Sequence, residues 1–258
     1  MFNAKKTKDD IIEWIRTYFA QQPSAKGDVI GISGGKDSTV VAGLLVEALG
    51  AERVYGVLMP NGHQADIEDS IRVCALLGID YQIVDIKHTF NNLVHEIEYH
   101  SGDISEQAKI NIAPRLRMTT LYAIGQTMGY RVAGTGNKSE GYVGYCTKWG
   151  DTAHDFNPIG NLTKEQVVAI GDVLGLPHEL VHKAPSDGLT GKTDEDNLGF
   201  TYAQVAEVIE TGKTDDKEAY QSIRKAHLGS RHKFSDIPKF IPRQYAIHLK
   251  LKGGNVNG

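Results

Sequence analysis

Apolar and polar residues follow one another along the chain in blocks that predict strands and helices in turn. Short apolar runs rich in Val and Ile, each followed by glycine, proline or polar residues, are typical of buried strands. The predicted strands are residues 29–33, 54–60, 81–86 and 131–136. Elsewhere apolar residues recur at helical spacing. This predicts helices at residues 9–21, 38–49, 64–77, 88–99, about 114–128, 163–174, 201–210 and 215–227.

Strand and helix alternate three times in the first third of the chain, which is the pattern of a parallel sheet with helical crossovers. We therefore predict an α/β fold, a doubly wound parallel sheet of the Rossmann-like type with flanking helices. The helix at 38–49 is apolar on nearly every side, so we expect it to be buried and to end at Gly50.

Three local patterns refine this outline. Pro114 is expected in the first turn of its helix, where a missing N–H costs little. Residues 163–166, Thr-Lys-Glu-Gln, have the spacing of a helix capping box. The glycine-rich residues after the fourth strand are expected to be irregular, and residues 185–200 are expected to form a polar loop.

The length of 258 residues allows one large domain or two small ones. No internal repeat or low-complexity linker divides the sequence, so we predict a single domain over residues 1–258. Within it, the core is expected at about 28–175, a C-terminal loop and helices at 176–245, and a flexible tail at 252–258.

Composition excludes several classes of protein. The 28 Lys and Arg against 32 Asp and Glu give a net charge of −4, which argues against nucleic-acid binding through a basic surface. No uncharged apolar run reaches the roughly 18 residues of a membrane helix, and the charged first residues do not resemble a signal peptide. Two cysteines, Cys74 and Cys146, are too few for a disulfide framework. We therefore expect a cytoplasmic protein without a membrane or nucleic-acid partner.

The 28 glycines exceed the average share of about 7%, and several follow the first strand in the run Ser33-Gly34-Gly35-Lys36-Asp37-Ser38. Glycine lets the backbone approach an anion, and N–H groups at a helix start, together with serine hydroxyls, can hold phosphate oxygens. The spacing matches neither a Walker A loop nor G-x-G-x-x-G. A carboxylate such as Asp37 would repel a phosphate unless a cation lay between them, which points to Mg²⁺.

The motif SGGKDS resembles the pyrophosphate loop (PP-loop) of the ATP pyrophosphatases, which cleave ATP between its α and β phosphates. That superfamily includes NAD synthetase, GMP synthetase and tRNA-modifying ligases, and has an adenine nucleotide alpha hydrolase-like fold. The resemblance implies ATP binding by Gly31, Ile32, Ser33, Gly34, Gly35, Lys36, Asp37 and Ser38.

Two further segments, NIAPRLRMTTLY (111–122) and GTGNKSEGYVGYCTKWGDTAHDFNP (134–158), are similar to ammonia-dependent NAD synthetases. The chain departs from that family at Pro114, where alanine is more usual, and at Ser186, where threonine is more usual. The resemblance implies further ATP contacts at Thr135, Lys164 and Ser186. It implies Mg²⁺ ligands at Asp37 and Glu140. It implies deamido-NAD contacts at Arg115, Lys148, Asp155, His232 and Lys233. It implies catalytic roles for Asp151, Lys164 and Asp37, with Asp151 near the ammonia.

The resemblance implies a ligase that amidates deamido-NAD⁺ (nicotinic acid adenine dinucleotide) with ammonia at the expense of ATP. The carboxylate would be adenylated first, and the products would be NAD⁺, AMP and pyrophosphate, the last step of NAD⁺ biosynthesis. A homodimer is also implied. Cys74 lies on the apolar face of a predicted helix and Cys146 lacks the setting of an amidotransferase nucleophile, which favours free ammonia over glutamine. Another PP-loop ligase, such as a GMP synthetase core, or a nonenzymatic ATP-binding module remains the alternative.

Overall fold

A computed structural model describes residues 2–64, 67–183, 194–240 and 242 of the chain. In this part of the chain a parallel sheet has the strand order β3-β2-β1-β4. Its strands are β1 (Gly27–Gly31), β2 (Val54–Leu58), β3 (Asp80–Ile83) and β4 (Tyr130–Val132). The predicted α/β class is confirmed, although each strand ends earlier than its apolar run.

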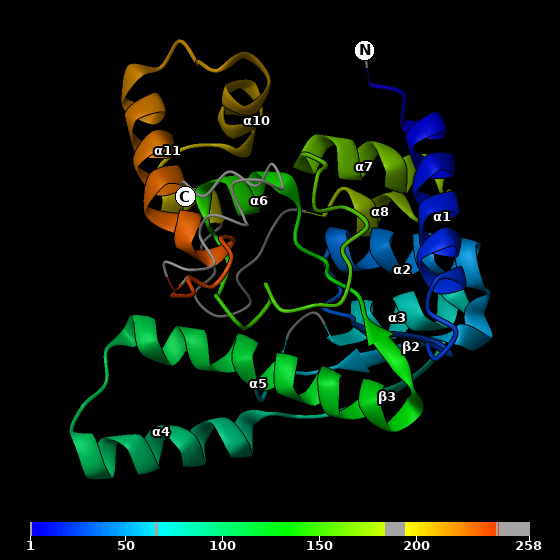
Figure 1. Ribbon diagram of the computed structural model, residues 1–258, viewed down its shortest axis with the longest axis horizontal. Coiled ribbons are helices and arrows are strands. Elements are labelled where there is room, and N and C mark those ends of the chain that lie inside the picture. The colour runs from blue at the N-terminus through cyan, green and yellow to red at the C-terminus, as the bar shows by residue number, and fades with distance from the viewer. Residues whose placement is uncertain (1, 65–66, 184–193, 241, 243–258) are drawn as a thin grey trace.

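Helices cover both faces of this sheet (Figure 1). On one face lie α1 (Ala4–Ala20), α2 (Lys36–Leu49), α3 (Ile67–Leu77) and α7 (Lys164–Val173). On the other face α5 (Glu106–Met128) packs against β1 and β4, and α4 (Lys87–Ser101) lies beside α5. None of the described helices is both long and apolar enough to cross a membrane.

Apolar side chains fill both sides of the sheet. Ile30 of β1 packs among α1, α2 and α7 with Leu44 and Ile170, all fully buried. Its neighbour Val29 points to the opposite face and packs under α5 with Val57, as period-2 alternation requires. The nearly all-apolar helix α2 is buried and ends at Gly50, as predicted.

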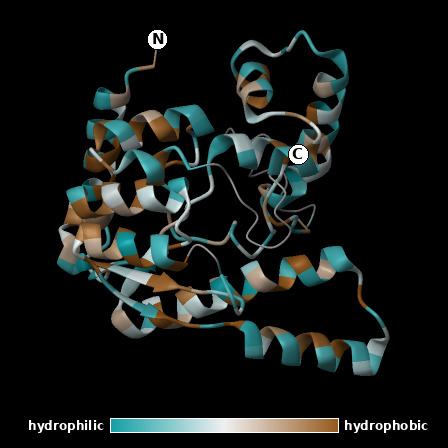
Figure 2. Cartoon of the chain, turned by 180° about the vertical axis from the view of Figure 1, so that it is seen from behind, coloured by the Kyte–Doolittle hydropathy of each residue, from teal (hydrophilic) through white to brown (hydrophobic). Residues whose placement is uncertain are grey.

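A separate cluster holds the C-terminal helices. The short α6 (Lys138–Val143) packs against α10 (Tyr202–Thr211) and α11 (Lys217–Ser230), with Val143, Val205 and Ile223 buried between them. In Figure 2 these helices stand apart from the sheet, and apolar residues face the inside of the group. The remaining short elements are the 3₁₀ helices η1 (Ala51–Arg53) and η2 (Arg231–Lys233) and the helices α8 (His178–Val181) and α9 (Asp194–Leu198).

Three local predictions are wrong. Pro114 lies inside α5 rather than at its start, because Ser105 caps the helix earlier by accepting the N–H of Ala108. The bond that proline cannot donate would have gone to the carbonyl of Ile110, a residue that is exposed. The glycine-rich stretch is not wholly irregular, since it contains α6. Residues 194–198 are helical rather than loop, whereas 185–193 and the tail 252–258 lie outside the described residues.

The chain order of the strands creates a switch point beside β1. From β1 the chain moves outward through β2 to β3, and then α4 and α5 return it to β4 on the other side of β1. Ligands of doubly wound sheets bind where such a reversal opens a crevice at the carboxyl ends of the strands. The Ser33–Ser38 loop follows β1 directly, so it lies at this position.

Candidate functional site

The loop after β1 is built to present backbone N–H groups. Gly34 has φ of +75°, a conformation that favours glycine. The Ser33 and Ser38 hydroxyls hydrogen-bond each other at 3.0 Å, and Ser33 Oγ accepts the N–H of Gly35 at 3.2 Å. The Ser38 hydroxyl also donates to the Gly35 carbonyl at 3.1 Å. These bonds close the loop into one turn.

Helix α2 starts at the end of this loop with Gly35 as its N-cap, and no side chain caps it. Its first-turn N–H groups therefore remain available to an anion, at the positive end of the helix dipole. Asp37 stands in that first turn and Lys36 precedes it. The predicted ATP-contact residues 31–38 are thus contiguous around one helix start, which is the geometry of a phosphate site.

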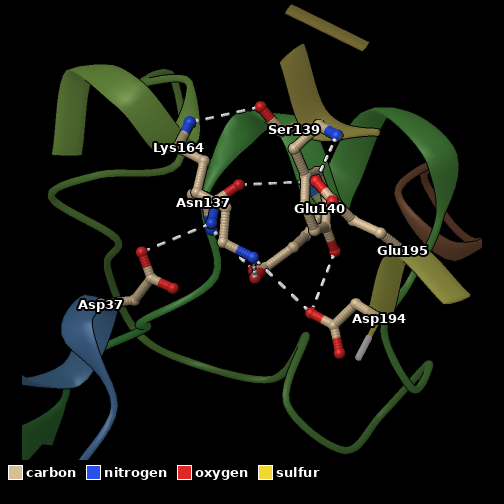
Figure 3. A network of polar contacts seen from close by, with 8 residues as sticks. Asp37, Asn137, Ser139, Glu140, Lys164, Asp194 and Glu195 are labelled. Carbon is tan, nitrogen blue, oxygen red and sulfur yellow. Dashed lines mark hydrogen bonds and ion pairs between the residues drawn. The ribbon is translucent and has the colours of Figure 1, made fainter. Parts of the chain in front are cut away.

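Asp37 faces α6 across the mouth of the loop. The amide Nδ2 of Asn137 donates to Asp37 Oδ1 at 3.4 Å (Figure 3). Asn137 also forms a capping box with Glu140: its Oδ1 accepts the Glu140 N–H, and Glu140 Oε2 accepts the Asn137 N–H at 3.3 Å. Asn137 thus links the two predicted metal carboxylates, which come from residues 103 positions apart.

Lys164, at the start of α7, lies on the other side of Glu140. Its Nζ is 3.8 Å from Glu140 Oε1 and 3.6 Å from Asp194 Oδ2. The same ammonium lies 3.7 Å from the centre of the Tyr202 ring. The lysine is 7% exposed, so these groups provide most of its surroundings.

Burial dominates the electrostatics of this cluster. It raises the pKa of Asp37, and together with the nearby Asp37 charge it raises the pKa of Glu140 to about 8. Burial, followed by repulsion from Lys164, lowers the pKa of Lys36. Two carboxyl groups that resist ionisation together are suited to a bound cation, and their hard oxygens suit Mg²⁺.

The number of side-chain ligands limits how the protein could hold this metal ion. Within the described residues no group of three or more His, Cys, Asp or Glu side chains is arranged to hold an ion. Mg²⁺ commonly binds through one or two carboxylates with water and substrate phosphate oxygens completing its shell. Asp37 and Glu140 beside a phosphate loop fit that pattern.

A second group of predicted residues lies where α5 meets residues 146–155. Arg115 Nε donates to the Lys148 carbonyl at 3.3 Å. Lys148 Nζ reaches the carbonyl of His232 at 2.7 Å, and Lys233 Nζ donates to the carbonyls of Gly144 and Cys146. The predicted substrate residues Arg115, Lys148 and the His232–Lys233 pair are therefore brought together, although His232 follows Lys148 by 84 positions in the sequence.

Asp151 belongs to the same group. Its Oδ1 accepts the Thr147 N–H at 2.7 Å, and Thr147 Oγ1 donates to Asn111 of α5. Although Asp151 as a residue is exposed, desolvation of its carboxyl raises its pKa. Arg117, also on α5, donates its Nε to the Met59 carbonyl just after β2. Burial lowers the pKa of Arg117, and the charge of Asp151 opposes that shift.

Asp155 is held at the sheet instead. Its Oδ2 accepts the N–H of Val132 in β4 at 2.8 Å, and Tyr122 OH donates to Oδ1 at 3.4 Å. Thr135 is half-buried and lies on the segment between β4 and α6. Ser186, the remaining predicted ATP contact, lies outside the described residues.

The structure adds residues that the sequence patterns did not single out. Asn137 contacts the carboxylate of Asp37, and both Asp194 and the ring of Tyr202 contact the ammonium of Lys164. The charge of Asp151 acts on the pKa of Arg117. The Asn-x-x-Glu spacing of the α6 capping box was a readable signal for Asn137. Asp194 and Tyr202 carry no such signal, because only tertiary packing brings them to Lys164. Cys74 is in the core as predicted, and burial raises the pKa of its thiol to about 11.

Comparison with known proteins gives a consistent picture. A family model described as NAD synthase matches residues 7–245. The chain is 40% identical to an NH(3)-dependent NAD(+) synthetase of Archaeoglobus fulgidus over 238 residues, 90% of this chain and 94% of the relative. Among solved structures, an NMN synthetase from Francisella tularensis has a TM-score of 0.85 and 33% identity, covering 94% of this chain and 100% of the other. An NH3-dependent NAD synthetase from Campylobacter jejuni has a TM-score of 0.78 and 28% identity, covering 93% and 100%.

Proposed function

The chain belongs to the NAD synthase family, and on that premise we propose that it amidates deamido-NAD⁺ with ammonia at the expense of ATP. The products are NAD⁺, AMP and pyrophosphate. The observation that carries this proposal is the convergence of the loop at residues 33–38 with Asp37, Glu140 and Lys164 at the switch point of the sheet. A loop for pyrophosphate beside two carboxylates and an ammonium suits cleavage of ATP between its α and β phosphates.

The reaction needs ATP because a carboxylate is a poor electrophile. A substrate carboxylate oxygen attacks the α-phosphorus of ATP, the bond to the β-phosphate oxygen breaks, and pyrophosphate leaves. Ammonia then attacks the carbonyl carbon of the mixed anhydride, AMP leaves and a proton is released. The loop N–H groups at residues 33–38 bind the departing pyrophosphate, and Lys164 stabilises the charge that develops on it.

We assign a bound Mg²⁺ to Asp37 and Glu140. When bound, the ion would neutralise negative charge on the phosphate oxygens as pyrophosphate forms. Asn137 holds both carboxylates, that of Asp37 through its side-chain amide and that of Glu140 through its backbone N–H, so the protein contributes the position of the metal ligands before the ion arrives.

Asp151 is the candidate for handling ammonia. Ammonia is mostly ammonium at neutral pH, and a carboxylate can bind the ion and help to accept its proton. Thr147 and Asn111 fix the Asp151 side chain, while the raised pKa of the carboxyl favours proton uptake. Arg115, Lys148, Asp155, His232 and Lys233 remain the proposed contacts of deamido-NAD⁺.

A second candidate substrate is the mononucleotide. The NMN synthetase from Francisella tularensis matches this chain with a TM-score of 0.85 over 94% of its length. The same adenylation and amidation would convert nicotinic acid mononucleotide into NMN, with the same loop and the same carboxylates. The two reactions differ only in whether the substrate carries an adenylate half.

The test is pyrophosphate release from ATP in the presence of ammonium. Deamido-NAD⁺, nicotinic acid mononucleotide and XMP are offered in turn, with a sample lacking any acceptor as control. We expect deamido-NAD⁺ to give the highest kcat/KM. Preference for the mononucleotide would favour the second candidate, whereas release with XMP alone would favour a GMP synthetase and contradict both.

We also propose a homodimer of single-domain subunits that contact through α4 and α5. Leu93, Tyr99 and Ile110 on these helices are exposed, and within its described length α4 has no buried residue. Such a surface suits a protein–protein contact. Sedimentation that finds an active monomer would contradict the dimer. A cytoplasmic location stays a prediction, supported by the two free cysteines.

A further inference from the structure

The ammonium of Lys164 is shared by three groups in this structure. Glu140 Oε1 and Asp194 Oδ2 lie 3.8 and 3.6 Å from Nζ, and the face of Tyr202 lies 3.7 Å away (Figure 3 shows the first two). The lysine side chain is 9% exposed and those of Glu140 and Asp194 are 20% and 15% exposed. A charge with so little access to water depends on its partners for its position.

The two acidic partners of Lys164 have different further contacts. Glu140 also accepts the N–H of Asn137 and is the proposed second carboxylate of the metal site, so its charge is divided among several partners. No hydrogen bond in the described structure joins Asp194 to Asn137 or Asp37, although the charges of Asp194 and Asp37 repel each other. Its Oδ2 instead accepts the hydroxyl of Tyr202 at 3.3 Å, and the ring of that same tyrosine lies against the ammonium.

Tyr202 is therefore fixed from two sides. It is 3% exposed and begins α10, and its N–H donates to Glu195 Oε1 at 2.8 Å. Its hydroxyl holds Asp194, and its negatively polarised face attracts the ammonium of Lys164. The neighbouring acids of α9 thus have separate tasks: Glu195 ties α9 to the start of α10, and Asp194 reaches Lys164.

We propose that Asp194 is a positioning residue that, with the ring of Tyr202, holds the Lys164 ammonium at the phosphate site. This inference rests on the proposed function, in which Lys164 stabilises departing pyrophosphate. When Glu140 binds the proposed metal ion, its contact with Lys164 weakens. Asp194 and the Tyr202 ring are then the contacts that keep the ammonium in place. In this proposal Asp194 acts through Lys164 and not on ATP or the second substrate directly.

The experiment measures the adenylation half-reaction alone, as exchange of labelled pyrophosphate into ATP with deamido-NAD⁺ or nicotinic acid mononucleotide and without ammonia. Asp194→Asn removes the charge that faces Lys164, and Glu195→Gln removes the neighbouring charge, which accepts the Tyr202 N–H. We expect Asp194→Asn to lower kcat of exchange at least about 10-fold, with KM for the nucleotide acid within about 2-fold of the wild type. Glu195→Gln should keep kcat within about 3-fold, and Asp194→Glu should recover part of the lost rate.

Each outcome separates the inference from the proposed function. If the wild type exchanges pyrophosphate with neither acid, the proposed function fails. If the wild type exchanges but Asp194→Asn and Glu195→Gln lose rate equally, Asp194 only anchors α9 and the inference is overturned. Should Asp194→Asn not fold, Tyr202→Phe keeps the ring and removes the hydroxyl that holds Asp194. That variant should lose about 3-fold or more in kcat, and a kcat equal to the wild type would contradict the inference.

Discussion

Replacing Asp28 by asparagine is expected to stabilise the protein, by an amount that grows as the pH rises. Asp28 lies in β1 between β2 and β4 and is fully buried. Neither of its carboxyl oxygens has a hydrogen-bond partner within the described structure. Burial first, and the charge of Asp155 second, raise the pKa of Asp28 well above its ordinary value. The folded protein therefore keeps Asp28 protonated at pH values where the unfolded chain has released that proton.

The magnitude follows from proton linkage. A group whose pKa is raised by folding contributes its full stability below the unfolded pKa, about 3.9 for Asp, and loses it as the pH rises toward the folded pKa. Within that window each pH unit costs about 1.4 kcal/mol of the free energy of unfolding. Asparagine has nearly the same shape and no ionisation, so the variant lacks this slope.

The assay is urea unfolding of both proteins at several pH values, starting at pH 5. The difference in the free energy of unfolding, variant minus wild type, should grow from pH 5 to pH 6, at a slope of up to about 1.4 kcal/mol per pH unit while folded Asp28 stays protonated. Asp80→Asn, at an exposed position in β3, corrects for the general effect of removing a carboxylate. A difference that stays constant over this range would show that Asp28 is ionised in the folded protein and would refute the reasoning.

Three further predictions concern the site and the core. Glu140→Gln should lower steady-state kcat about 100-fold and raise the Mg²⁺ concentration needed for half-maximal rate, since one of two proposed metal carboxylates is lost; an unchanged Mg²⁺ dependence would contradict the assignment. Asp151→Asn should lower the ammonia-dependent rate about 100-fold while pyrophosphate exchange continues, and an unchanged ammonia-dependent rate would exclude its proposed role. Gly27→Ala places a Cβ 2.4 Å from the carbonyl of Arg53 and should cost about 1–3 kcal/mol in urea unfolding. Its control, Gly229→Ala in α11, meets nothing within 4 Å and should stabilise by about 0.5–1 kcal/mol; equal effects would contradict the steric argument.

Most of the sheet could be predicted because its strands carry strong local signals. Ile30 and Val57 belong to apolar runs that end at turn residues, so the positions of these strands along the sequence could be predicted. The ends of the strands could not, because apolar residues such as Met59 follow the last paired residue of β2 and stay buried. The start of α5 was missed because Pro114 is a strong local signal for a helix start, and tertiary packing of the helix outweighed it.

The site divides in the same way. The loop at 33–38 was found because glycine, serine and aspartate have specific local uses at a helix start. Asp194 could not be assigned a role, since its contact with Lys164 depends on where α9 and α10 pack rather than on any spacing in the sequence. The role of Arg117 was equally hard to predict, because arginine on a helix is usually exposed and only the fold brings its guanidinium to the Met59 carbonyl.

The central claim is that this chain forms a carboxamide from a nicotinic acid nucleotide and free ammonia. Its most direct test supplies ATP, Mg²⁺, deamido-NAD⁺ and ¹⁵N-labelled ammonium to the purified protein and measures the NAD⁺ product by mass spectrometry. We expect NAD⁺ carrying one ¹⁵N atom in its amide and one AMP for each NAD⁺ formed. The same reaction with amide-¹⁵N glutamine in place of ammonium should give no labelled NAD⁺. Absence of labelled NAD⁺ with ammonium, together with ATP cleavage to ADP, would contradict the account.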